Sequence, residues 1–105
     1  MAFLYITEYN QLIITGTGRG GVPVEPAIAY QRIDNTGVSV ASAVLNPRTV
    51  FVRLHTDSIC SFKVAAAPTA VVAENRMPAN GTEYFGIDPV VHKATPLKIA
   101  AVLNT

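Results

Sequence analysis

The chain has little formal charge. Only 15 of its 105 residues are charged, eight basic and seven acidic. This share of 14% lies well below the roughly 25% of an ordinary soluble domain, while 50% of the residues are hydrophobic and the mean hydropathy is +0.32. A domain of this length buries only about 60–70% of the surface of its unfolded chain. We therefore interpret the charge deficit as the mark of an assembly subunit, part of whose surface faces other protein.

Other absences exclude whole classes of function. The formal net charge is only +1 and the basic residues are spread along the chain, unlike the clustered basic surface of nucleic-acid-binding domains. The single cysteine, Cys60, excludes an internal disulfide framework. No apolar run approaches the ~18 residues of a membrane span, and residues 2–6 lack the basic start of a signal peptide. We expect neither a nucleic-acid nor a membrane partner, and synthesis in the cytoplasm.

What the chain does contain is a series of short segments in which apolar residues alternate with polar ones, which is typical of half-buried β-strands. The expected strands cover residues 3–8, 11–15, 28–33, 38–44, 49–55, 59–64, 82–87 and 97–103. Two prolines allow residues 22–26 to form edge structure only, and Pro68 limits the alanine-rich segment 65–73 to one helical turn. The sequence predicts one all-β domain: an antiparallel β-sandwich or small barrel, with a jelly-roll as one candidate topology.

The middle of the chain has the clearest pattern. One face of segment 49–55 carries Val50, Val52 and Leu54, and the other carries Phe51, Arg53 and His55. In segment 59–64, the inward side chains would be Cys60, Phe62 and Val64, with Ser61 and Lys63 outward. We predict that these two segments form an antiparallel hairpin across a turn at residues 56–58. In segment 38–44, the shared face would carry Val38, Val40 and Val44.

A glycine-rich segment matches a nucleotide-binding motif by its letters alone. Gly16, Gly18 and Gly21 have the spacing of the dinucleotide fingerprint, which works only where a helix opens at the last glycine. The following Val-Pro-Val-Glu-Pro segment, residues 22–26, cannot begin such a helix. Arg19 alone is too little for a phosphate site. We expect a flexible loop or arm and no cofactor.

Three potential metal ligands, His55, Asp57 and Cys60, lie within six residues. No second cluster completes a tetrahedral site, and His92 is distant in sequence. The simpler interpretation is a strand end, a turn former and a small buried thiol. A nucleophilic pair of Cys60 with either histidine can be drawn in any chain with these residue types. We expect no metal, no catalytic residue and no enzyme activity.

The aromatic residues allow two interpretations. The set consists of Tyr5, Tyr9, Tyr30, Tyr84 and Phe85. It could form a carbohydrate platform, but such residues more often supply the core of a protein interface, which we favour. A cavity lined by Asn80, Glu83 and Tyr84 would favour glycan binding, whereas a flat apolar patch would favour assembly.

Three stretches carry a family resemblance: Phe-Val-Arg-Leu-His-Thr-Asp-Ser-Ile-Cys-Ser at residues 51–61, Pro-Thr-Ala at residues 68–70, and Arg-Met-Pro-Ala-Asn-Gly-Thr-Glu-Tyr-Phe-Gly at residues 76–86. Over residues 49–87 the chain resembles small β-rich proteins of tailed bacteriophages, of the decoration or cement type that sits on the outside of the capsid. The resemblance implies a β-sandwich or jelly-roll body, self-association, contact with the major capsid protein and no catalytic residues.

Together these features predict a structural virion protein on the capsid exterior. We expect a homo-oligomer, dimer or trimer, that stabilises the phage head through protein contacts, with residues 2–26 touching the shell or sister subunits. The alternative is a small virion fibre or lectin-like module that binds a glycan or receptor on the host surface.

Overall fold

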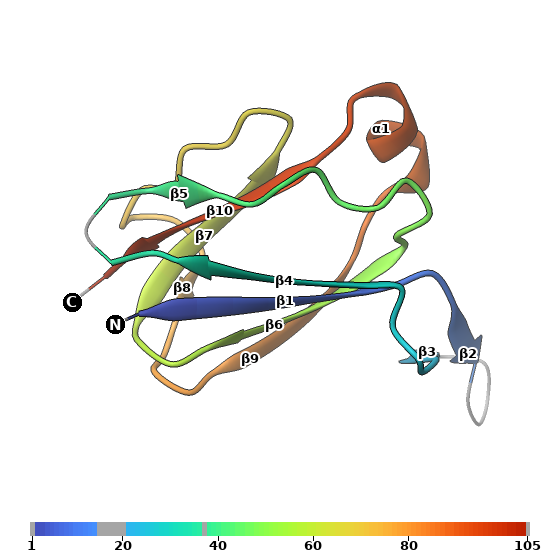
Figure 1. Ribbon diagram of the computed structural model, residues 1–105, viewed down its shortest axis with the longest axis horizontal. Coiled ribbons are helices and arrows are strands. Elements are labelled where there is room, and N and C mark those ends of the chain that lie inside the picture. Colours follow the sequence, from blue (N-terminus) through green and yellow to red (C-terminus); the bar gives the residue numbers. More distant parts are fainter. Residues whose placement is uncertain (1, 15–20, 37, 105) are drawn as a thin grey trace.

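The computed structural model describes residues 2–14, 21–36 and 38–104. They form two antiparallel sheets packed face to face and a separate two-stranded hairpin (Figure 1). The first sheet has the order β4 (Ala29–Asp34), β1 (Phe3–Tyr9), β6 (Phe51–Thr56), β9 (Thr82–Gly86). The second has the order β5 (Val40–Ala41), β10 (Lys98–Leu103), β7 (Cys60–Ala65), β8 (Arg76–Met77). The hairpin pairs β2 (Leu12–Ile14) with β3 (Gly21–Pro23). The all-β sandwich prediction is confirmed.

One short helix, α1 (Pro89–Ala94), lies at the end of the sandwich opposite the chain termini (Figure 1). The carboxylate of Asp88 accepts hydrogen bonds from the Val90 and Val91 amides, and Pro89 opens the helix, where its missing N–H costs nothing. The alanine-rich segment 65–73, which could have held one helical turn, contains bends and turns and no helix. No helix in the described part of the chain has the length and hydropathy needed to cross a membrane.

The core lies between the two sheets and follows the predicted alternation. Its fully buried members include Leu4, Ile6, Val52, Leu54, Cys60, Met77, Ile99 and Ala101. Partly buried Val64 packs against this cluster, and Phe62 stacks on Phe85 of the facing sheet with ring centroids 5.8 Å apart and planes inclined by 6°. The inward assignment therefore holds for Val52, Leu54 and Cys60, with Phe62 and Val64 at the rim of the core. Val50, also expected in the core, is half-buried and lies outside this cluster.

The predicted hairpin is wrong. β6 pairs with β1 and β9, while β7 pairs with β10 and β8, so the chain crosses from one sheet to the other between them. The Thr56 hydroxyl donates to the Ser58 carbonyl at 2.6 Å inside this crossing. Alternation fixes which face of a strand is buried, but two inward-facing strands can lie in the same sheet or in facing sheets.

Two smaller expectations also fail. Ser61, expected outside, is fully buried because its hydroxyl donates to the Val72 carbonyl at 3.2 Å and accepts from the Asn104 amide at 2.9 Å. Val38 and Val44, expected to share one strand face with Val40, are exposed, whereas Val40 packs against the core. Only two residues of segment 38–44 form a strand, so the period-two pattern does not extend along the segment.

The outer faces of the two sheets differ. Over the second sheet, the loop after β7 folds back: Val72 receives hydrogen bonds from Ser61 and Asn104, and Ala70 is buried. Small side chains such as Ala100 lie beneath it, fully buried. On the first sheet, Tyr9 is buried beside Glu25 at one end of the outer face, whereas the rest of that face carries three exposed tyrosines. This bare face is where a functional surface can form.

Substitution of a fully buried leucine and of a phenylalanine at the rim tests the assignment of core positions. Leu54→Ala should lower the free energy of unfolding by about 2–5 kcal/mol, as expected for truncation of a fully buried leucine. Phe62→Ala should cost less, because the ring is only partly buried. Urea unfolding followed by circular dichroism measures both. A larger loss for Phe62→Ala than for Leu54→Ala would show that the rim and centre are wrongly assigned.

Candidate functional site

The outer face of the first sheet is an ordered grid of side chains. Strand pairing sets Tyr5 of β1 beside Arg32 of β4 and His55 of β6, and one step along it sets Thr7 beside Tyr30 and Arg53. Tyr84 and Thr82 of β9 continue the two rows beyond Arg53 and His55. Neighbouring strands lie about 4.8 Å apart, so these side chains form one continuous surface.

Aromatic contacts join this surface along and across the strands. Ring centroids are 6.4 Å apart for Phe3 and Tyr5, and 6.3 Å for Tyr5 and His55. Phe51 lies between Tyr9 at 6.4 Å and Tyr84 at 6.0 Å. These tilted and edge-on arrangements are favourable for aromatic pairs. The rings therefore restrict one another's orientation. Their surfaces remain accessible to solvent, since Tyr30 is 70% exposed, Tyr84 56% and Tyr5 40%.

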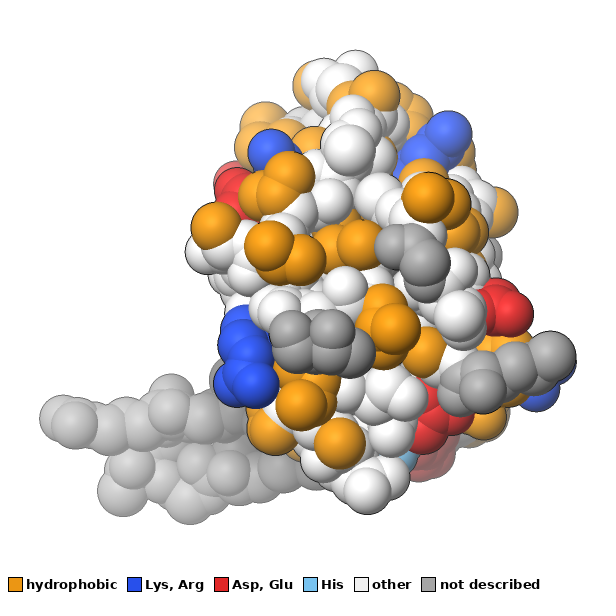
Figure 2. All heavy atoms as spheres, turned by 90° about the vertical axis from the view of Figure 1, so that its left-hand side faces the viewer, with side chains coloured by type: hydrophobic (Ala, Val, Ile, Leu, Met, Phe, Trp, Pro, Cys, Tyr) orange, Lys and Arg blue, Asp and Glu red, His pale blue; other side chains and the backbone are white. Residues whose placement is uncertain are grey.

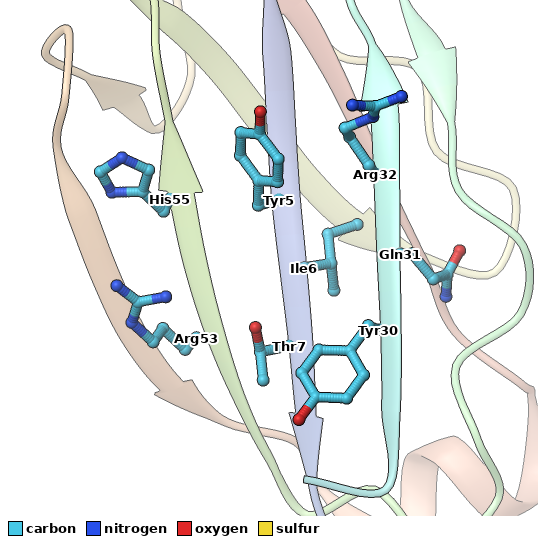
Figure 3. A pocket seen from close by; sticks show the side chains of 8 residues that line it. All are labelled: Tyr5, Ile6, Thr7, Tyr30, Gln31, Arg32, Arg53 and His55. Carbon is cyan, nitrogen blue, oxygen red and sulfur yellow. The ribbon is translucent and has the colours of Figure 1, made fainter.

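A hollow of about 510 Å³ opens in this face. The lining residues are Tyr5, Ile6, Thr7, Tyr30, Gln31, Arg32, Arg53 and His55 (Figure 3). Thr7 lies between Arg53 and Tyr30, with Tyr5 next to it on the same strand (Figure 3). Because Thr7 is much shorter than these neighbours, its position forms the floor. We call this site the Thr7 hollow.

The Thr7 hollow is lined by basic and aromatic groups and by no carboxylate. The Arg32 guanidinium carbon lies 4.4 Å from the centre of the Phe3 ring, a cation–π arrangement that orients the side chain. Nδ1 of His55 is 2.9 Å from the Thr82 hydroxyl. In the described part of the chain, the one ion pair within 4.0 Å is Lys63–Glu74 on the other sheet, so neither arginine has a carboxylate partner there.

Among the described residues, the carboxylates of Asp34 and Glu25 lie at the margins of this face. Hydrogen bonds from Thr36 hold the pKa of the Asp34 carboxyl below its usual value. A Glu25 oxygen accepts the Tyr9 hydroxyl at 3.0 Å; burial, then this hydrogen bond, raises the pKa of Tyr9. Both carboxylates are thus engaged by local donors.

The residues considered as a metal site are not brought together. His55 points outward, whereas Cys60 is fully buried in the core. An Asp57 oxygen accepts the Phe3 amide at 2.8 Å. His92 is the buried residue of α1. Its Nδ1 accepts the Leu97 amide at 3.0 Å, which leaves Nε2 to donate to the Asn46 carbonyl at 2.9 Å. No group of three metal-binding side chains occurs within residues 2–14, 21–36 and 38–104.

The residues considered for a glycan cavity also separate. Tyr84 points outward beside Arg53, whereas the next residue, Glu83, pairs with buried Leu54 and points to the opposite side. Asn80 lies in the preceding turn with φ of 59°. Of the glycine motif, Gly16, Gly18 and Arg19 lie outside the described residues, and Gly21 begins strand β3, not a helix.

A second hollow of about 510 Å³ lies beside α1. Its walls are mainly aliphatic: Val44, Leu45, Pro47, Pro89, His92, Lys93 and Pro96. Val90 and Val91 on the helix are exposed. Apolar surface is therefore present at this end of the sandwich as well as on the sheet face.

Comparison of the chain with protein-family models, with curated proteins and with solved structures finds no match. The functional argument therefore depends on the residues of the chain itself.

Because Cys60 is buried, we can predict how protein stability depends on pH and how slowly the thiol reacts. Burial raises the pKa of its thiol, so ionisation favours the unfolded chain and stability should fall as pH rises above the unfolded thiol's pKa. In the native protein at neutral pH, Ellman's reagent should react with Cys60 roughly a thousandfold more slowly than in urea, because labelling requires opening of the core. Labelling at the same rate with and without urea would place the thiol at the surface.

Proposed function

We propose that this chain is a structural subunit of a virus particle, a decoration protein that binds the outside of a bacteriophage capsid and stabilises it. The observation that carries the proposal is the bare outer face of the first sheet. It presents Tyr5, Tyr30 and Tyr84 to solvent on a sandwich whose other outer face is covered by its own loop. The resemblance of residues 49–87 to small virion proteins suggests the capsid exterior as the place where the protein acts.

The composition of this face suits a protein partner. Tyrosine and arginine are enriched in interface cores and at the residues that contribute most to binding. Here they alternate on adjacent strands, with Tyr30 and Arg53 on either side of Thr7. A standard interface buries roughly 800 Å² on each partner, a small part of the 5974 Å² surface of this chain. One such contact leaves surface for further neighbours.

Additional apolar surface is available for those neighbours. The β2–β3 hairpin projects from the sandwich (Figure 1), and its Leu12 is exposed. At the end that carries both termini, hydrophobic side chains are spread across the surface and charged ones lie toward its margins (Figure 2). Val72 is exposed beside Asn104, near the C-terminus. A subunit that touches a shell and its own copies needs several such surfaces.

The mechanism is thermodynamic linkage. A protein that binds the assembled shell, and not its dissociated subunits, stabilises the shell by mass action. Because a capsid offers many equivalent sites, modest contacts become collectively large. No chemistry at a catalytic site is required.

Undecorated shells of the virus that encodes the chain provide the test. Added protein should bind them and raise the temperature at which they disrupt. The double variant Tyr30→Ser, Tyr84→Ser should bind at least about tenfold more weakly, as expected for two interface tyrosines. Arg76→Ala on strand β8, exposed on the other sheet, is the control and should bind normally.

Equal heat resistance of shells with and without the protein would reject the decoration role. The glycan- or receptor-binding alternative would then be the better account. Circular dichroism of each variant excludes loss of the fold as the cause of weakened binding.

A further inference from the structure

We infer that the Thr7 hollow receives an acidic side chain, aspartate or glutamate, of the partner protein. The existence of that partner rests on the proposed function; the ligand chemistry is argued from the hollow itself.

The shape of the hollow suits a single inserted side chain. Its floor is the short side chain of Thr7, and its walls come from the neighbouring strands, Tyr30 on β4 and Arg53 on β6 (Figure 3). Alternate residues of a strand lie roughly 7 Å apart, so Tyr5 bounds the floor along β1. With a volume of about 510 Å³, the hollow is large enough to admit an amino-acid side chain.

The charge of the hollow selects an anion. Arg32 and Arg53 lie on opposite sides of β1 (Figure 3), and His55 is the third basic group of the lining. No acidic residue lines the hollow, and the described residues supply no carboxylate within 4.0 Å of either guanidinium. Two nearby acids accept local hydrogen bonds: Asp34 accepts the Thr36 amide at 3.0 Å and also interacts electrostatically with Arg32, and Glu25 accepts Tyr9 and Ala27.

The two arginine side chains are held in position before any ligand binds. Arg32 is held against the Phe3 ring at 4.4 Å, and Arg53 is only partly exposed between Phe51 and His55. A guanidinium restricted in this way loses less conformational freedom on binding and offers two parallel N–H groups to a carboxylate. An ion pair that becomes covered by an interface is also screened less by salt than an exposed one.

The lining favours a protein carboxylate over an acidic sugar. The single amide of the lining, Gln31, is already bonded to Glu8 and to the backbone of Ala43, so it is not free to bind a saccharide hydroxyl. The rings of Phe3, Tyr5 and His55 are tilted against one another, and so do not form a flat stacking platform. Tyrosine with arginine is the composition of protein-binding residues.

The first experiment uses undecorated shells and two variants. Arg53→Gln removes the charge, and Thr7→Ile fills the hollow with a β-branched side chain that a strand accommodates. Each should weaken shell binding by about tenfold or more, and the wild-type affinity should fall with added salt. Arg76→Gln is the matched control, since it removes an exposed arginine from the other sheet. Wild-type affinity of Arg53→Gln and Thr7→Ile would overturn the inference while leaving the proposed function intact.

The second experiment needs no partner. The isolated, isotope-labelled protein is titrated with blocked glutamate, with blocked glutamine and with glucuronate, and amide chemical shifts are followed by NMR. Blocked glutamate should shift the amides of Thr7, Tyr30 and Arg53, and the shifts should vanish in Arg53→Gln. Equal shifts with blocked glutamine, or no shifts with blocked glutamate, would overturn carboxylate recognition.

Tighter binding of glucuronate would reassign the hollow to acidic glycans and overturn the inference. If the protein fails to bind shells, the proposed function fails, and the titration alone decides whether the hollow recognises a carboxylate.

Discussion

The buried carboxylate of Glu8 fixes the central strand of the first sheet. One oxygen accepts hydrogen bonds from the backbone amide of Asn46 at 2.7 Å and from the Thr49 hydroxyl at 2.9 Å. The other oxygen accepts from the side-chain amide of Gln31 at 3.2 Å. A buried carboxylate is costly unless its acceptor sites are occupied, so Glu8 must face inward to keep these partners. A one-residue slip of β1 would expose Glu8 and bury Thr7. The outward direction of Tyr5, Thr7 and Tyr9, and with it the Thr7 hollow, depends on this constraint.

The same carboxylate connects the two ends of the chain. Asn46, whose amide Glu8 accepts, offers its carbonyl to Nε2 of His92, and Nδ1 of that ring accepts the Leu97 amide just before β10. Residues from β1, the loop before β6, and α1 are therefore linked by hydrogen bonds where the two sheets meet. This end of the sandwich is held by polar contacts, whereas its centre is held by packing of aliphatic side chains.

The sequence allowed part of this structure to be predicted, and the limits have physical causes. Alternation correctly separated Val52 and Leu54 from Arg53 and His55, because a strand with one buried face has a strict period of two. It could not show that β6 and β7 lie in facing sheets, nor that β1 places Thr7 between Tyr30 of β4 and Arg53 of β6. Pairing between distant strands leaves no mark in a single sequence. Glu8 was missed because a charged residue ordinarily indicates an exposed position.

The structure shows where this chain of low charge exposes aromatic surface. Aromatic side chains gather on one sheet face together with two arginines that have no carboxylate partner among the described residues, while the opposite face is covered by the chain's own loop. We therefore propose as the central claim that the outer face of β4, β1, β6 and β9 is buried by a partner in the assembled state. That claim gives the charge deficit, the exposed tyrosines and the Thr7 hollow a single explanation.

Tyrosine nitration tests this claim most directly. The free protein and purified particles that contain it are treated with tetranitromethane, and each tyrosine is quantified by peptide mass spectrometry. Tyr30 and Tyr84 should be nitrated in the free protein and protected in the particle, while Tyr9, which is buried in the chain itself, should remain unreactive in both. Equal nitration of Tyr30 and Tyr84 in the two samples would show that this face stays open to solvent and would contradict the account.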